Sequence, residues 1–127
     1  MLPITELQFS ILRVLWQRGS ATVNDVHEAL RAERGLAPTT VATLLTRMEK
    51  RGLVSHQTVG RRHVYEPVVS EGEVRTSMLD AVSEGVFDGD VSEMVCHLLA
   101  ARDVTPDDLK RVRETLAALE DDREDEQ

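Results

Sequence analysis

The chain is poor in aromatic residues, has one cysteine and contains no long apolar run. Its aromatic residues are Phe9, Trp16, Tyr65 and Phe87, so we expect an aliphatic and largely helical core. The single cysteine, Cys96, excludes an internal disulfide framework, which fits a reducing cytosol. A membrane-spanning helix needs about 20 consecutive apolar residues. Neither such a run nor a basic segment leading into an apolar one occurs, so we expect a cytoplasmic protein.

Residue sets that catalyse reactions are also missing. We find no nucleophile–base pair, glycine-rich phosphate loop or paired carboxylates in an apolar setting, so we expect neither an enzyme nor a cofactor. His27, His56 and His63 fit packing or phosphate contact better than metal binding. Cys96 and His97 are adjacent, and neighbouring helical residues point about 100° apart, so one helix does not easily aim both at one metal. For Cys96, a structural role is favoured over a thiol switch, an intersubunit disulfide or a metal site.

Formal charge is divided unevenly along the chain. Residues 1–66 contain nine Lys and Arg against six Asp and Glu, whereas residues 67–127 contain six against seventeen, which together give the net charge of −8. Two units with different partners explain this asymmetry better than one uniform surface does. Because an acidic surface repels DNA, we expect any contact with nucleic acid in the first half.

Three amphipathic helices are expected before residue 52. Their start and stop signals are the capping pairs Thr5/Gln8 and Thr22/Asp25, Pro38 at the first turn of the third helix, and the glycines Gly19, Gly35 and Gly52. Short turns join the three helices, and the third carries an unusual polar face. This arrangement predicts a helix-turn-helix unit.

The third helix has two different faces. Its apolar stripe, at helical spacing, is Val41, Leu44, Leu45 and Met48. The opposite stripe contains hydroxyls and cations but no carboxylate, namely Thr39, Thr40, Thr43, Thr46, Arg47 and Lys50. Small residues and arginine suit a helix laid into the DNA major groove. The alternative is a solvated amphipathic helix, but threonine is a mediocre helix former, so these residues would cost stability without a packing return.

An alternating pattern follows the third helix. Residues 53–59 and 63–67 are two β-prone runs separated by Gly60, Arg61 and Arg62, which predicts a hairpin with a basic tip. A basic hairpin behind a recognition helix is a wing that reaches the minor groove or the phosphates. The alternative is a plain hairpin with solubilising arginines.

We assign base reading to Thr39, Thr40, Thr43 and Arg47, and contacts to the DNA backbone to Thr46, Lys50, Arg61 and Arg62.

Three further helices are expected from Ser70 to near Phe87, from Val91 to Ala101, and from Thr105 onwards. Their narrow apolar stripes have little to bury against within one chain, so we assign them to a dimer interface. The interface residues are Val74, Met78, Val82, Val86, Met94, Leu98, Leu109, Val112, Leu116 and Leu119. The alternative is a monomeric cap that folds back on itself.

The fold class expected is mainly α with a small β-hairpin. We divide the chain into a winged helix-turn-helix DNA-binding domain at 1–68, a three-helix dimerisation domain at 69–120 and a disordered acidic tail at 121–127. A DNA-reading unit joined to a self-associating unit predicts a two-fold symmetric homodimer that binds double-stranded DNA at a palindromic site. The competing interpretation keeps the fold but makes it a protein-interaction module without specific DNA binding.

Four segments of the sequence are similar to one family. The runs 7–16, 22–30, 39–54 and 62–67, above all Thr-Thr-Val-Ala-Thr-Leu-Leu from Thr39 to Leu45, resemble the BlaI/MecI family of penicillinase repressors. The resemblance implies a bacterial homodimeric winged-helix repressor on a palindromic operator. It also implies antibiotic response, because classical members are induced when a membrane-bound sensor-protease system detects a β-lactam.

Two features of the family are not matched in this sequence. Classical members are cut within the dimerisation domain at an Asn-Phe bond, and the corresponding position here is His97-Leu98. Copper-responsive relatives carry a cluster of C-terminal cysteines as metal ligands. Cys96 alone cannot form that cluster, so we expect no metal site.

Overall fold

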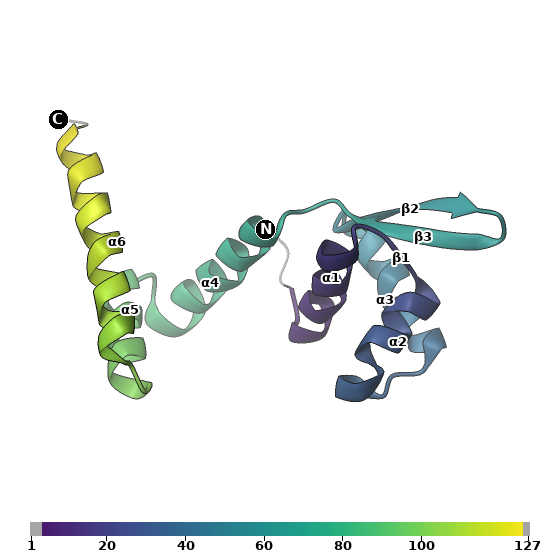
Figure 1. Ribbon diagram of the computed structural model, residues 1–127, viewed down its shortest axis with the longest axis horizontal. Helices are drawn as coiled ribbons and strands as arrows, with labels where there is room; N and C mark the ends of the chain where they lie inside the picture. Colours follow the sequence, from purple (N-terminus) through teal and green to yellow (C-terminus); the bar gives the residue numbers. More distant parts are fainter. Residues whose placement is uncertain (1–3, 126–127) are drawn as a thin grey trace. The chain divides into compact units, whose positions relative to one another are not determined.

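The computed structural model describes residues 4–125, and these form helices and one small antiparallel sheet (Figure 1). The chain divides into two compact units, Met1–Val82 and Ser83–Gln127. The boundary differs from the one expected at residue 68, because the fourth helix begins in the first unit and ends in the second. The expected fold class, mainly α with a β-hairpin, is confirmed.

The first unit begins with three helices whose capping signals work as expected. The helices are α1 (Glu6–Arg18), α2 (Val23–Arg34) and α3 (Pro38–Lys50). In the capping box of α1, the Gln8 backbone N–H donates to the Thr5 hydroxyl and the Thr5 N–H donates to the Gln8 side chain, each at 3.1 Å. The pair Thr22/Asp25 does the same for α2. Because each box satisfies two otherwise unpaired donors, both helix starts are fixed by local sequence.

The first unit also contains a three-stranded sheet: two strands follow α3, and the third, between α1 and α2, was not predicted from the pattern. The strands are β1 (Ala21–Thr22), β2 (Val54–Val59) and β3 (Arg62–Pro67), in the order β1-β3-β2. Ala21 pairs with Tyr65, which fastens the α1–α2 connection to the hairpin. Val59 pairs with Arg62, so Arg62 belongs to β3 and only Gly60 and Arg61 form the tip. The hairpin extends beyond the three helices as a wing (Figure 1).

The core of the first unit is largely aliphatic. The buried apolar residues include Ile11, Leu12, Leu15, Val26, Leu30, Val41, Leu45, Met48, Val54 and Tyr65. The apolar stripe predicted for α3 therefore faces the core, with Leu44 only partly buried at its edge. The indole Nε1–H of Trp16 donates to the carbonyl oxygen of Val69 at 2.9 Å, which ties the chain beyond β3 back to α1.

Helix α4 (Glu71–Phe87) corrects one of the interface assignments, that of Val74. Its first turn is capped by Ser70, whose hydroxyl accepts the Glu73 N–H at 3.1 Å. Val74 is only 1% exposed and belongs to the core, while Met78 packs partly against that core. Because the first turns of α4 pack onto the first unit, Val74 is already covered within one chain and is not available to a second chain.

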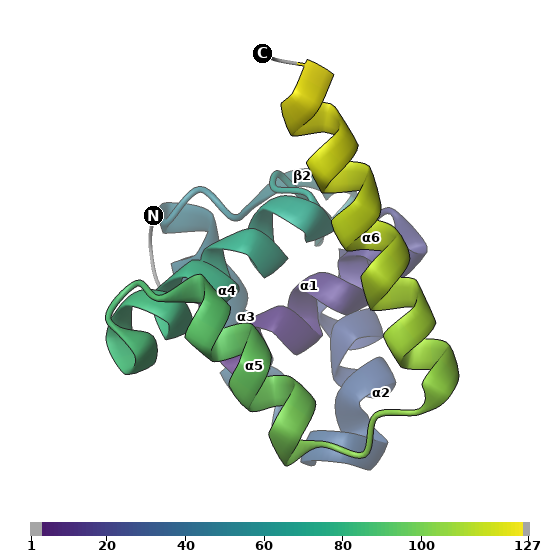
Figure 2. The same ribbon diagram turned by 90° about the vertical axis from the view of Figure 1, so that its left-hand side faces the viewer.

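The second unit contains the end of α4 together with α5 (Val91–Ala101) and α6 (Pro106–Asp125). None of the described residues of α5 or α6 is buried, and the two helices diverge from the loop that joins them (Figure 2). Helix α6 continues to Asp125, which corrects the disordered tail expected from residue 121. Glu and Arg are good helix formers and prolong the helix here, whereas residues 126–127 lie outside the described part. No helix within residues 4–125 is long and apolar enough to span a bilayer.

Candidate nucleic-acid interface

The polar stripe of α3 lies on the surface. Its six members, Thr39, Thr40, Thr43, Thr46, Arg47 and Lys50, are all exposed. On the other side of the helix, Val41, Leu45 and Met48 are fully buried. The helix is therefore held to the core by one face and presents hydroxyls and cations on the other.

Two of these threonines use their hydroxyl protons within the helix. The Thr43 hydroxyl donates to the Thr39 carbonyl oxygen at 3.0 Å, and the Thr46 hydroxyl donates to the Ala42 carbonyl oxygen at 2.9 Å. A hydroxyl has one proton to donate and lone pairs that accept. In this conformation, Thr43 and Thr46 present to a ligand a methyl group and an acceptor, but no donor.

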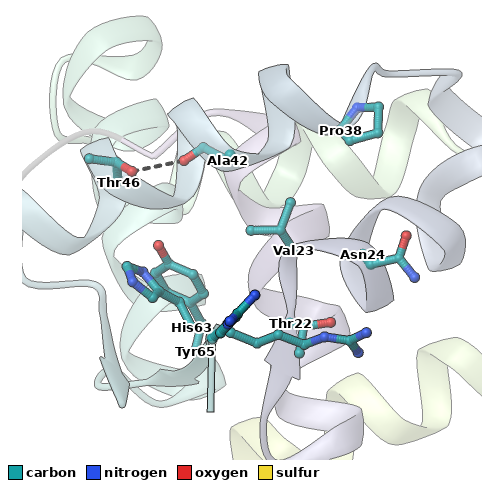
Figure 3. A pocket seen from close by; sticks show the side chains of 10 residues that line it. Thr22, Val23, Asn24, Pro38, Ala42, Thr46, His63 and Tyr65 are labelled. Carbon is teal, nitrogen blue, oxygen red and sulfur yellow. Dashed lines mark hydrogen bonds between the residues drawn. The ribbon is translucent and has the colours of Figure 1, made fainter. Parts of the chain in front are cut away.

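A hollow of about 580 Å³ opens between the start of α2, helix α3 and strand β3. We call it the helix–wing hollow, and its lining residues are Thr22, Val23, Asn24, Pro38, Ala42, Thr46, Arg61, Arg62, His63 and Tyr65. Figure 3 shows Thr22, Val23 and Asn24 from the start of α2 together with Thr46 of α3 and the hairpin residues His63 and Tyr65. Three predicted backbone contacts, Thr46, Arg61 and Arg62, therefore line one concave surface.

Residues that the sequence pattern did not select also line this hollow. Asn24 is exposed in the first turn of α2, and His63 lies on β3. The signal that could have indicated Asn24 is its place two residues after the Thr22 cap, at the end of the helix that carries partial positive charge. By contrast, Thr39, Thr40, Thr43 and Arg47 do not line the hollow, so the base-reading and wing assignments occupy separate parts of the surface.

An ionised carboxylate is built into the start of α2. The backbone N–H of Thr22 donates to Asp25 and lowers the pKa of its carboxyl group below the ordinary value. The Thr22 side chain lowers this pKa further, as do the positive charges of Arg18 and Arg62. Arg62 therefore lies within the electrostatic reach of Asp25 as well as lining the helix–wing hollow.

The remaining interface candidates lie at the end of the first unit and in the second unit. Val82, at the end of the first unit, and Val86, in the second, are both exposed. The other exposed candidates are Leu98, Leu109, Leu116 and Leu119, and the half-buried ones are Met94 and Val112. Val95 was not selected from the sequence, yet it lines a hollow of about 430 Å³ with Val112 and Leu116. Cys96 is exposed, so within the single chain it does not have the packing role favoured from the sequence.

Comparison with known proteins identifies the family. The sequence profile described as penicillinase repressor matches residues 4–118. The chain belongs to the penicillinase repressor family. The transcriptional regulator BlaI of Mycobacterium tuberculosis is 37% identical over 117 residues, which cover 91% of this chain and 83% of that protein. The penicillinase repressor of Bacillus licheniformis is 23% identical over 113 residues, which cover 89% of this chain and 88% of the relative.

Solved structures of the family match the DNA-binding part of this penicillinase repressor homologue. The solution structure of the DNA-binding domain of the repressor BlaI has a TM-score of 0.50 at 30% identity and covers 55% of this chain and 85% of that one. The Bacillus licheniformis BlaI monomeric form, in complex with the blaP half-operator, has a TM-score of 0.50 at 29% identity, covering 57% and 88%. The winged helix-turn-helix fold expected from the sequence is confirmed by these matches.

Proposed function

We propose that this penicillinase repressor homologue binds operator DNA through α3 and the wing and thereby represses transcription. The observation that carries the proposal is the stripe of exposed threonines and cations on α3, in a domain similar to a BlaI structure in complex with a half-operator. Membership of a repressor family supports the expectation that the chain is not an enzyme. The competing protein-interaction module leaves this stripe without a role.

The roles of the DNA-facing residues follow from their chemistry. Arg47 is the candidate for two parallel hydrogen bonds to guanine, and Thr39 and Thr40 lie at the helix start, where recognition helices contact bases. Thr43 presents a methyl group, which suits apolar contact with thymine. Lys50, Arg61 and Arg62 are assigned to phosphates. In its observed conformation Thr46 cannot donate to a phosphate, whose oxygens only accept, so we reassign it to close van der Waals contact.

We infer that the second unit pairs with a second copy. Val86 is 70% exposed, and Leu116 and Leu119 are 52% and 55% exposed. Removing such side chains from water on association stabilises a dimer. Two copies related by a two-fold axis would place two α3 helices on a palindromic operator, which multiplies the specificity of one helix.

The inducing partner is a separate proposal. The family resemblance suggests a membrane sensor-protease as the partner of a cytoplasmic repressor. The peptide bond at the position where classical members are cut joins His97 and Leu98. This bond lies within α5, and a protease needs an extended segment. Proteolytic induction would therefore require α5 to unwind locally around that bond.

DNA footprinting with the promoter of its own operon tests the function. We expect protection of two half-sites about 10 base pairs apart or a multiple of this, with binding that weakens steeply as salt rises. Equal affinity for promoter and random DNA, with a folded protein, would refute the repressor assignment and favour the protein-interaction module. Sedimentation measurements on the same sample test the dimer independently.

A further inference from the structure

A carboxylate of the recognition helix contacts an imidazole of the wing. The Nδ1 atom of His56, on β2, lies 2.7 and 2.6 Å from the two carboxylate oxygens of Glu49, on α3. About 30% of each side chain is exposed. A carboxylate only accepts hydrogen bonds, so the contact requires a proton on Nδ1. Glu49 is also the only carboxylate of α3, and this contact engages it with the wing.

The same imidazole stacks on a second one. The rings of His56 and His63 are 4.2 Å apart and only 9° from parallel, and Tyr65 lies 5.5 Å from the His56 ring. In the hairpin register, His56 is opposite Tyr65, while His63 is opposite Thr58. The three rings of Tyr65, His56 and His63 form a row. It begins at Tyr65, which is 4% exposed, and ends at His63, which lines the helix–wing hollow. A continuous set of contacts thus runs from α3 to the DNA-facing part of the wing.

We propose that Glu49 and His56 are positioning residues that hold the wing where its arginines reach the DNA backbone while α3 lies in the major groove. This inference rests on the proposed DNA-binding function and assigns neither residue a contact with DNA. It predicts that the exposed tip at Arg61 is placed by a contact made near the far end of α3. Metal binding does not compete with this role, because residues 4–125 contain no group of three or more His, Cys, Asp or Glu side chains that could hold a metal ion.

The physical reason is the weakness of the outer part of the hairpin, which has only two strands because β1 pairs with no residue of β3 other than Tyr65 and Val64. A hairpin without further support is marginally stable in water, and beyond His56 the side chains of Gln57, Thr58 and Val59 are exposed. Without the tether, the tip would sample many positions, and DNA binding would have to order it. A contact already present in the free protein removes part of that cost from binding.

The direction in which one substitution changes DNA affinity distinguishes a positioning role from a simple effect of charge. Removing a negative charge from a DNA-binding surface should tighten binding if charge alone matters. We expect Glu49→Ala to weaken operator binding instead, by roughly 3- to 10-fold, the worth of a typical hydrogen bond. Glu49→Gln should recover most of the affinity, because its amide oxygen still accepts the Nδ1 proton. The matched control is Glu66→Ala, which removes an exposed carboxylate opposite Ser55 on the same hairpin and should not weaken binding.

A double-mutant cycle tests whether the tether acts through the wing. Operator affinities are measured by fluorescence anisotropy for the full chain, for Glu49→Ala, for Arg61→Ala and for the double variant, with folding checked by circular dichroism. We expect Arg61→Ala to cost less affinity in the Glu49→Ala background than in the wild type, because the unanchored arginine contributes less. Additive losses, or unchanged or tighter binding by Glu49→Ala, would overturn the inference. Failure of the wild type itself to bind operator DNA would instead refute the proposed function.

Discussion

The hydroxyl of Thr46 donates to the carbonyl oxygen of Ala42, one turn back in α3, at 2.9 Å. Thr43 makes the same bond to Thr39. These bonds leave both side chains with methyl groups and acceptor oxygens toward the surface. The polar stripe of α3 therefore has fewer free donors than its sequence suggests, and the donors that remain are concentrated in the cations.

Thr46→Val tests this consequence, because valine keeps the shape and loses only the hydroxyl. We expect operator affinity to stay within about twofold of the wild type, since the lost hydroxyl makes no bond to DNA and a missing contact of typical strength would cost more. Fluorescence anisotropy with operator DNA measures the change. A tenfold loss would mean that the hydroxyl turns away from Ala42 and donates to a phosphate.

Arg47→Ala should reduce specificity. We expect a loss of about 1–3 kcal/mol on the operator and relaxed preference at one base pair in each half-site. The comparison variant is Arg61→Ala, at the wing tip, which should weaken binding to all sequences alike and flatten the salt dependence by about one unit. Binding selections on randomised operators provide the measurement. Equal losses on operator and random DNA would contradict base reading by Arg47.

Leu116→Asp should prevent formation of the proposed dimer. The side chain is 52% exposed in the single chain and lines the hollow with Val95 and Val112, so the charge would be buried without a partner in a dimer. Analytical ultracentrifugation measures the change, and affinity for a full palindrome should fall while half-site binding persists. Val59→Asp is the control, because Val59 is 62% exposed but lies in the wing. An unchanged dimer of Leu116→Asp would place the interface elsewhere.

Acid stability should depend on the capping carboxylate of α2. The pKa of Asp25 is lowered in the folded chain, first by the Thr22 backbone N–H. A lowered folded-state value means that the carboxylate stabilises the fold above the unfolded-state pKa, and that this contribution is lost as the pH falls through the folded-state pKa. Asp25→Asn should therefore lower the free energy of unfolding at neutral pH. In acid, the difference in this free energy between the variant and the wild type should become smaller. Urea unfolding at a series of pH values measures the free energy of unfolding of both proteins. A difference between them that does not change with pH would contradict a contribution of the ionised Asp25 carboxylate to stability.

Much of the helical structure and the two faces of α3 could be predicted because their signals are local. The capping pairs Thr5/Gln8 and Thr22/Asp25 act across three residues, and each satisfies its own helix end. The division of α3 into a buried and an exposed face follows from a period of about 3.6 residues. The threonines and cations of the candidate site therefore reach the surface for reasons already contained in the sequence from Pro38 to Lys50.

Tertiary structure decided what depends on distant segments. Strand β1 has two residues and no pattern of its own, and it exists because Ala21 meets Tyr65. Val74 is covered because α4 starts against the core of the first unit, although its spacing within α4 is equally suited to a dimer seam. The contact of Glu49 with His56 likewise depends on the hairpin lying beside the end of α3. Periodicity and caps specify which face of an element is apolar, but only the packing of elements determines what that face meets.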